Sequence, residues 1–159
     1  MNDRFFDKTR DFYAKLDRDL GDKVKECVTC RRCCEHAQIP YRGFEVDYIF
    51  EHLFRLGRAD LFEGLLNLGD SWGKTGAACL FYDKDKRVCM IQSVRPYNCR
   101  VFGPYSDEEL GVPEECCYKD STIPVPRDKV AETLPLFNEY HGLAHEYQVY
   151  LKSEDEEKK

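Results

Sequence analysis

Apolar residues recur at helical spacing among charged ones at the start of the chain. The positions that carry this pattern within residues 4–25 are Phe5, Phe12, Leu16, Leu20 and Val24. Apolar residues that repeat every three to four positions give a helix one apolar face. The pattern therefore predicts one amphipathic helix over residues 4–25, which leads directly into the first group of cysteines.

Three later segments carry the same helical pattern. Residues 45–56 predict a helix that ends at Gly57, because glycine readily adopts the left-handed conformation found just past a helix. Residues 58–69 predict a second, shorter helix, and we expect these two helices to cover the cysteine site. The pattern over residues 129–150 predicts a last helix, which Pro135 kinks or splits because proline has no backbone N–H to donate.

Short strands are expected only in the middle of the chain. Residues 79–90 predict a hairpin of two short strands around a polar turn. A three-residue loop in this hairpin would place Cys79 directly opposite Cys89. Residues 112–126 hold three prolines and a Cys-Cys pair, and we expect them to be irregular. The predicted fold class is α+β and mainly helical, with helices packed around a cysteine-ligated metal core and one short β-hairpin.

Length and composition indicate one folded unit. A chain of 159 residues is long enough to bury a core of its own. We expect a single cysteine-cluster metal-binding domain over residues 1–152, with its core motifs in residues 27–103. The acidic segment 153–159 predicts a disordered tail.

The charge of the chain argues against two classes of partner. A net charge of -6 does not suit a nucleic-acid backbone or an anionic membrane, because both bind basic surfaces. The first twenty residues are charged throughout, and no uninterrupted apolar run approaches about 18 residues, so we expect neither a signal peptide nor a membrane span. The predicted location is the cytoplasm.

Nine cysteines in a reducing compartment require an explanation other than disulfides. The strongest local signal is a run of four thiols within eight residues: Cys27, Cys30, Cys33 and Cys34. Two-residue gaps let a turn aim successive sulfurs at one centre, and both zinc knuckles and ferredoxin-type clusters use such gaps. The sequence therefore predicts a metal site.

The ligand count is open, because adjacent side chains point in different directions. Either one cysteine of the Cys33-Cys34 pair is a spectator, or the pair spans two centres. The same question applies to the second adjacent pair, in which Cys117 is unplaced and its substitution is expected to matter least. One centre with spare thiols and two four-thiolate centres remain equally consistent. The predicted ligands are Cys27, Cys30, Cys33, Cys34, Cys79, Cys89, Cys99 and Cys116.

Arginines beside the cysteines are expected to offset the negative charge of metal-bound thiolates. The residues predicted to offset this charge are Arg95 and Arg100, on either side of Cys99. Pro96 suits the start of a short helical turn, and a cysteine near that positive end is favoured as a thiolate. The segment therefore predicts a ligand held in a positive field.

The order of these motifs resembles that of a known family. CVTCRRCC, followed some way later by CLFYDKDKRVCMIQSVRPYNCRVFG, is similar to the YkgJ-type CxxCxxCC family of zinc- or iron-chelating proteins. The resemblance covers about residues 27–103, and Cys116 matches a further, more variable family cysteine. It implies metal chelation. A related cysteine module occurs in flagellin lysine-N-methylases, which implies that an iron–sulfur cluster is conceivable here.

Two functional hypotheses follow. The first is an iron–sulfur protein, holding a [4Fe-4S] cluster and acting in electron transfer or as an accessory to a modifying enzyme. The second is a zinc-stabilised structural, interaction or metal-handling module. The CxxCxxC triplet favours the cluster over Zn²⁺ by a small margin.

An independent enzyme is less expected, because the sequence has no glycine-rich phosphate or dinucleotide loop and no complete catalytic motif. Catalysis at an open metal position stays possible in principle. A protein partner is expected, since the acidic surface suits delivery of metal to a basic partner.

Overall fold

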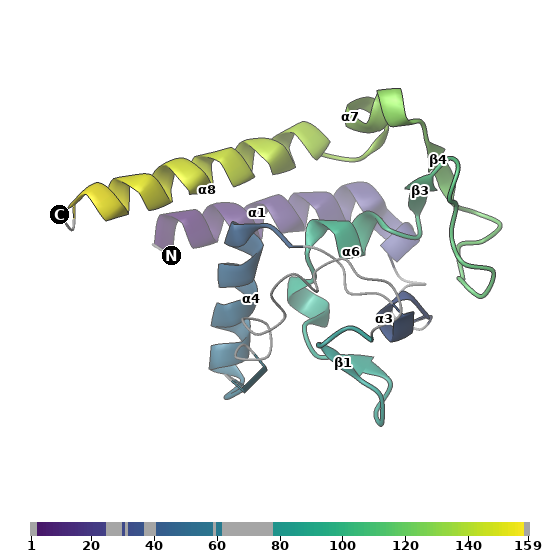
Figure 1. The fold of residues 1–159 in the computed structure, drawn as a ribbon, viewed down its shortest axis with the longest axis horizontal. Helices are drawn as coiled ribbons and strands as arrows, with labels where there is room; N and C mark the ends of the chain where they lie inside the picture. The colour runs from purple at the N-terminus through teal and green to yellow at the C-terminus, as the bar shows by residue number, and fades with distance from the viewer. Residues whose placement is uncertain are drawn as a thin grey trace.

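The computed structural model describes residues 3–24, 30, 32–36, 41–58, 60–61 and 78–157. Its two long helices, α1 (Asp3–Leu20) and α8 (Phe137–Glu157), lie side by side and run in opposite directions, while α4 (Gly43–Arg55) crosses them (Figure 1). The shorter helical elements are η1 (Gly21–Val24), α3 (Arg32–His36), η3 (Gln92–Val94), α6 (Tyr97–Val101), η4 (Arg127–Lys129) and α7 (Val130–Thr133). The mainly helical fold predicted from the sequence is confirmed.

The first helix follows the apolar pattern closely. Its buried face includes Phe5, Phe12, Leu16 and Leu20. Gly21 has a φ of +53° and starts the 3-10 turn η1 that follows. Two ion pairs join the exposed edges of α1 and α8, Lys8–Glu146 at 2.6 Å and Lys15–Glu139 at 2.5 Å. Exposed pairs of this kind contribute about 0–1 kcal/mol each, so the apolar face carries most of the packing energy.

Helix α4 begins two residues before the predicted start and ends close to the predicted end. The backbone N–H of Arg42 donates to Glu45 at 2.6 Å, and the N–H of Glu45 donates back to the carbonyl of Arg42 at 3.0 Å. After the helix, Gly57 has a φ of +67°, the left-handed conformation expected at a helix end. Most of the predicted helix over residues 58–69 lies outside the described residues.

The hairpin exists, but its predicted register is wrong. Strand β1 (Tyr82–Asp83) pairs with β2 (Val88–Cys89) in antiparallel fashion, so Tyr82 and not Cys79 stands opposite Cys89. The loop has four residues instead of three. Its geometry comes from the side chain of Asp83, which accepts the N–H of Lys86 at 2.9 Å, and from Arg87, which has a φ of +53°.

A second small sheet lies in a segment where only irregular structure was expected. Strand β3 (Tyr105–Asp107) pairs in parallel with β4 (Ile123–Val125). Pro124 lies within β4 and has no N–H to donate, which a strand tolerates at the edge of a sheet. The prediction of an irregular segment is therefore wrong for residues 123–125.

The C-terminal helical pattern is split at Pro135, as predicted. Pro135 and Leu136, which has a φ of +55°, stand between α7 and α8. Helix α8 continues to Glu157, so the predicted acidic tail begins as the last turns of this helix. None of the described helices is both long and apolar enough to cross a bilayer.

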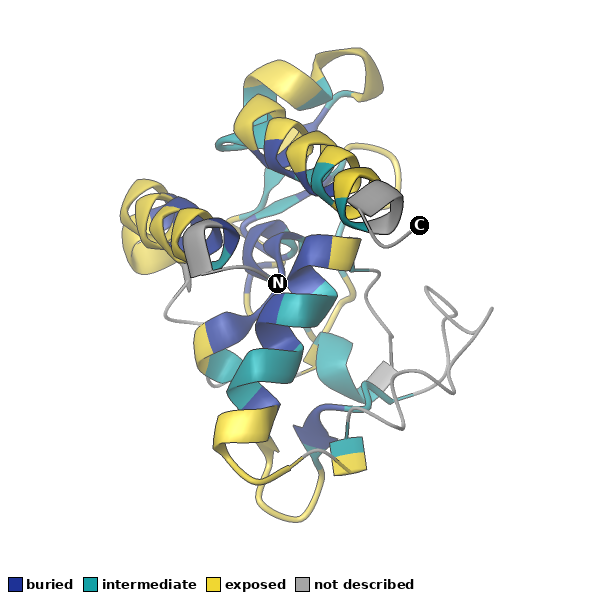
Figure 2. Cartoon of the chain, turned by 90° about the vertical axis from the view of Figure 1, so that its left-hand side faces the viewer, coloured by how far each residue is buried: buried dark blue, intermediate teal, exposed yellow. Residues whose placement is uncertain are grey.

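The buried faces of α1, α4 and α8 turn toward one another (Figure 2). In their midst lies the carboxylate of Glu45, which accepts hydrogen bonds from Tyr13 Oη at 2.5 Å, Tyr140 Oη at 3.0 Å and the Tyr97 N–H at 2.7 Å. The rings of Tyr97 and Tyr140 stack with centroids 4.2 Å apart. Helix α6, which carries Cys99, is thereby fixed to the helical core.

Candidate metal centre

Eight of the nine cysteines lie in the described part of the chain, and none of these eight forms a disulfide. Cys27, the first predicted ligand, lies outside the described residues. The eight thiols do not gather at one point. Three of them form one compact group, and the charges of three others, Cys33, Cys79 and Cys89, act on Cys99 in helix α6.

The compact group consists of Cys30, Cys116 and Cys117, called the triad below. The three Sγ atoms all lie within 4.8 Å of one another. Cys30 and Cys116 are partly buried, whereas Cys117 is exposed. The structure thus brings together two predicted ligands and a third cysteine for which the sequence predicted no role; its adjacency to Cys116 was the only signal for it.

Backbone N–H groups point at the sulfurs of the triad. The N–H of Cys117 donates to Sγ of Cys30 at 3.4 Å, and the backbone of Tyr118 donates to the thiol of Cys116. Such donors stabilise a thiolate. Burial nevertheless raises the pKa of Cys116, and the nearby charge of Cys30 raises it further. Three thiolates this close repel one another, so a bound cation is needed for them to ionise together.

A tight turn presents the two adjacent cysteines. The N–H of Cys116 donates to the carbonyl of Pro113 at 2.9 Å, and the N–H of Lys119 donates to the carbonyl of Cys116 at 3.1 Å. The buried Tyr118 anchors the turn, because its hydroxyl donates to the carbonyl of Lys23 and its ring lies against Gly103. The turn is therefore attached both to the end of η1 and to the loop after α6.

The spacing of the triad can be compared with metal–thiolate geometry. A tetrahedral Zn²⁺ ion with Zn–S bonds of about 2.3 Å holds its sulfurs about 3.8 Å apart. The three sulfurs lie within 4.8 Å of one another, so a small rotation of each side chain would bring them to that distance. An iron–sulfur cubane spreads its thiolates over the corners of a cluster and holds them further apart. The triad fits a single ion.

Three further thiols lie near enough to Cys99 for their charges to raise its pKa. This residue lies in α6, whose N-cap is Pro96, which confirms the predicted helical turn. Burial raises the pKa of Cys99 well above its ordinary value, and the neighbouring thiols of Cys79, Cys33 and Cys89 raise it further. The positive field expected at the start of the turn does not outweigh burial. Cys99 therefore ionises only with help from a cation.

The remaining predicted ligand, Cys34, is placed by its backbone. Its carbonyl accepts the N–H of Cys79 at 2.8 Å, which ties the first cysteine cluster to the residues before the hairpin. Its sulfur is not part of the triad. Of the adjacent pair, Cys33 is the one whose charge acts on Cys99.

The two arginines predicted to support the site differ in their placement. Arg95 is buried, and its charge lowers the pKa of Cys99, as a residue that offsets thiolate charge should. Arg100 is also buried, but its guanidinium pairs with Asp17 on α1 and donates to the carbonyls of Arg95 at 2.7 Å and Ser93 at 3.0 Å. Arg100 thus holds the segment that precedes Cys99.

A family comparison agrees with this cysteine pattern. The model of a family described as CxxCxxCC, "Putative zinc- or iron-chelating domain", matches residues 26–118, which is more than half of the chain. The chain belongs to the CxxCxxCC family. In this CxxCxxCC protein the matched region includes every cysteine, Cys117 included. No curated protein and no solved structure matches the chain.

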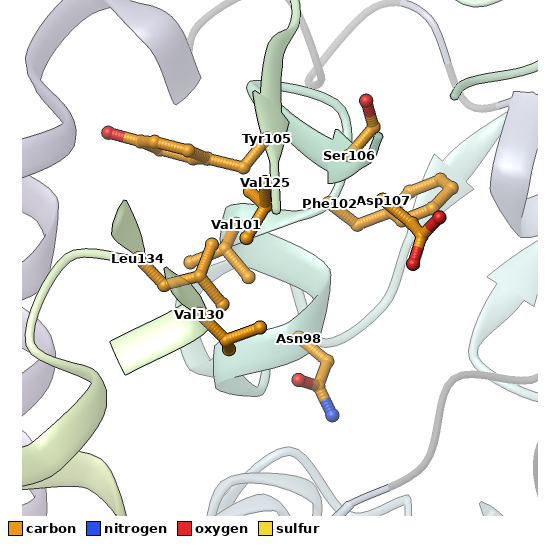
Figure 3. Close-up of a pocket in the computed structure, with 9 residues that line it drawn as sticks. All are labelled: Asn98, Val101, Phe102, Tyr105, Ser106, Asp107, Val125, Val130 and Leu134. Carbon is orange, nitrogen blue, oxygen red and sulfur yellow. The ribbon is translucent and has the colours of Figure 1, made fainter. Parts of the chain in front are cut away.

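A pocket of about 410 Å³ opens beside α6, and no cysteine is among the residues that line it. The side chains of Val101, Val130 and Leu134 gather at one end, and the amide of Asn98 and the carboxylate of Asp107 lie nearer the other (Figure 3). The pocket is separate from both groups of thiols, although Asn98 directly precedes Cys99 in the sequence.

Proposed function

We propose that this CxxCxxCC protein handles metal by holding one Zn²⁺ ion at the triad and exchanging it with a protein partner. The observation that carries the proposal is the spacing of three sulfurs within 4.8 Å of one another, one of them exposed. A purely structural zinc site is normally closed by four protein ligands, whereas a site at the surface can exchange a ligand with another molecule.

Zinc is the ion that best suits the donor set. Soft thiolates favour zinc over magnesium or calcium, which take oxygen ligands. The described residues supply three sulfurs, and the fourth position of a tetrahedral ion is then open to water or to a ligand of the partner. Binding would supply the positive charge that lets Cys30, Cys116 and Cys117 ionise together.

The partner is expected to be basic. The chain carries a net charge of -6, and thiolates bound to a divalent ion add further negative charge. Charge complementarity raises the rate of encounter between proteins more than it raises affinity, which suits a transient transfer complex. The exposed Cys117 is the ligand that a partner reaches first.

The test is the zinc content of the full chain and the rate at which a chromophoric chelator removes the ion. Wild-type protein should bind one zinc at the triad and release it on mixing. Cys117→Ser removes one ligand and should weaken zinc binding at least tenfold. Cys34→Ser is the matched control, because Cys34 is a partly buried cysteine outside the triad. Equal zinc affinity in Cys117→Ser and wild type would contradict the proposal.

A second candidate function is electron transfer, alone or as an accessory to a modifying enzyme, through an iron–sulfur cluster. The observation that favours it lies outside the triad: the charges of Cys33, Cys79 and Cys89 act on Cys99. Both functions require thiolate-bound metal, and they use different ligands. The two are therefore separable by substitution.

A further inference from the structure

A cavity of about 370 Å³, distinct from the pocket in Figure 3, opens where the start of α4 faces α6 and the first turns of α8. It is called the aromatic cavity below, because most of its wall consists of the rings of Tyr41, Tyr97, Phe137, Tyr140 and His141. Cavities that hold small molecules usually measure about 300–1,000 Å³. The aromatic cavity is therefore large enough for a small organic ligand.

The walls of this cavity are fixed by their own contacts. The rings of Tyr97 and Tyr140 stack with centroids 4.2 Å apart, and those of Phe137 and His141 lie 4.4 Å apart. The hydroxyl of Tyr97 donates to the carbonyl of Pro135 at 2.8 Å, which joins α6 to the residues before α8. Sites for small molecules are commonly formed before the ligand enters, and these contacts provide such a frame.

The cavity is positively charged in a chain whose net charge is -6. Arg42 lines it, and none of the described residues around it is an Asp or a Glu. Burial raises the pKa of the Tyr140 hydroxyl, and the charge of Arg42 opposes that rise. Burial lowers the pKa of His141, and the charge of Arg42 lowers it further. The guanidinium therefore acts on two of the aromatic walls.

The carboxylate of Glu45 does not neutralise this charge within the cavity. Glu45 is buried and is not part of the lining, and it already accepts hydrogen bonds from Tyr13, Tyr140 and the backbone N–H of Arg42. Within the described residues, no carboxylate forms an ion pair with the guanidinium of Arg42. An anion that enters the cavity would meet a cation that the fold leaves available.

We propose that the aromatic cavity binds a small aromatic carboxylate, whose carboxylate pairs with Arg42 and whose ring packs against the rings of Tyr140 and His141. The site is separate from the triad, and this inference does not rest on the metal proposed there.

The two parts of the ligand follow from the two parts of the cavity. A guanidinium presents a planar fork of N–H donors that matches the two oxygens of a carboxylate. Aromatic rings favour offset-stacked or edge-to-face contact with another ring, beyond the gain from burial alone. One permanent cation suits a single negative charge better than a phosphate group, which carries nearly two. A cationic ligand is disfavoured, because Arg42 would repel it.

The experiment is calorimetric titration of the full-length protein with benzoate and with the larger 2-naphthoate. Benzamide has the ring of benzoate without its charge, and cyclohexanecarboxylate has the charge without the aromatic ring. Benzamide should bind at least about tenfold more weakly than benzoate, because it cannot form the charged hydrogen bonds. Cyclohexanecarboxylate should bind at least about threefold more weakly.

Arg42→Gln removes the cation with little risk to the fold. Helix α4 begins with the backbone groups of Arg42, which glutamine also supplies, and the residue is exposed. Benzoate affinity should fall at least about tenfold in this variant. Arg55→Gln is the matched control, because Arg55 lies on the same helix and pairs with Glu51 at 2.8 Å, away from the cavity lining. Its benzoate affinity should equal that of wild type.

The position of the ligand is read from the imidazole signals of wild-type protein by nuclear magnetic resonance. Benzoate should shift the ring C–H signals of His141, since an aromatic ring against the imidazole changes its magnetic environment. His145 is the internal control, because it lies one turn further along α8 and does not line the cavity. This measurement and the comparison of the four ligands need no variant, so the proposal stays testable even if Arg42→Gln does not fold.

Four results would overturn the proposal: no binding of benzoate or 2-naphthoate to wild type, equal affinities for benzoate and benzamide, wild-type affinity in Arg42→Gln, or shifts at His145 without shifts at His141. Carboxylates can also bind a metal ion, so Cys117→Ser is titrated as well. Unchanged benzoate affinity in Cys117→Ser supports the cavity, whatever the zinc content of that variant. Benzoate binding that is lost in Cys117→Ser and kept in Arg42→Gln would place the ligand at the triad and overturn the inference.

Discussion

The ring of Tyr118 fills the space in which a side chain on Gly103 would lie. A Cβ atom on Gly103 would stand 2.6 Å from Cδ2 of that ring, and Gly103 has a φ of +102°. Conformation and contact thus both restrict this position to glycine. Since Tyr118 directly follows Cys117, Gly103 is linked to the triad although it offers no ligand.

Gly103→Ala should therefore weaken metal binding at a distance. The positive φ costs on the order of 1–3 kcal/mol for a residue with a Cβ, and the ring of Tyr118 must move as well. The turn that presents Cys116 and Cys117 would shift with it. We expect unfolding at lower denaturant concentration and zinc affinity reduced about tenfold, measured by competition with a chelator.

Gly142→Ala is the matched control for this substitution. Gly142 lies within α8, and nothing stands within 4 Å of a Cβ placed there. Alanine should stabilise the helix by up to about 1 kcal/mol and leave zinc affinity unchanged. Wild-type zinc affinity in Gly103→Ala would show that the contact with Tyr118 does not position the triad.

Tyr118→Phe separates the ring from the hydroxyl. The ring can still pack against Gly103, but the hydrogen bond to the Lys23 carbonyl is lost. We expect a stability loss of about 0.5–1.5 kcal/mol, together with weaker zinc binding, because this bond ties the turn to η1. Tyr147→Phe is the control: it loses a hydrogen bond to Asp47 at 2.5 Å, on helices that carry none of the triad cysteines. Equal zinc affinities in the two variants would argue against the role of the hydroxyl.

The sequence predicts the helices well because the information for them is local. The apolar spacing of Phe12, Leu16 and Leu20 directly describes the buried face of α1, and Gly57 ends α4 as expected. The register of the hairpin fails for the opposite reason. Its loop contains no glycine, and nothing in the sequence marks Arg87 as the residue that adopts a positive φ.

The grouping of the cysteines depends on contacts that local spacing cannot reveal. Cys30 and Cys117 are 87 positions apart, yet the N–H of one donates to the sulfur of the other. Spacing places Cys30 and Cys33 in one motif but leaves open whether that motif serves one centre or two. In the structure, Cys30 joins Cys116 and Cys117 beside the turn that Tyr118 anchors, and Cys33 is not part of this group. Which cysteines lie together is therefore decided by tertiary packing.

Arg100→Lys should loosen the segment that precedes Cys99 without affecting the triad. The guanidinium of Arg100 pairs with Asp17, donates to two carbonyls in residues 93–95, and lies 4.6 Å from the centroid of the Tyr13 ring. An ammonium group cannot reproduce this planar set of donors. We expect a stability loss of about 1–3 kcal/mol with unchanged zinc affinity, measured by denaturant unfolding and by competition with a chelator.

Arg55→Lys provides the comparison for Arg100→Lys. Arg55 lies on the exposed side of α4 and pairs with Glu51 at 2.8 Å, so its replacement should change stability by less than about 0.5 kcal/mol. Zinc should be retained in both variants. Equal stability of the two variants, or loss of zinc in Arg100→Lys, would contradict the role of Arg100 in holding the segment before Cys99.

Tyr140→Phe tests the buried carboxylate that joins α4 to α6 and α8. Burial raises the pKa of Glu45, while the hydrogen bonds donated by Tyr13, Arg42, Tyr97 and Tyr140 oppose that rise. Loss of the Tyr140 hydroxyl should raise the pKa of Glu45 further. A carboxyl whose pKa is higher in the folded than in the unfolded state favours folding below the unfolded value, and this contribution is lost as the pH rises through the folded value.

The cost of Tyr140→Phe should accordingly depend on pH. Below about pH 4 the carboxyl is neutral in both states, so the variant should be nearly as stable as wild type. At neutral pH the ionised carboxylate lacks a donor, and the free energy of unfolding should fall by about 1–3 kcal/mol. Denaturant unfolding across this pH range measures the effect.

In a Glu45→Gln background the same substitution should show no pH dependence, because no carboxyl remains to titrate. A cost that is the same at acid and neutral pH would mean that the lost stability comes from ring packing with Tyr97, and that Glu45 does not respond to this hydroxyl.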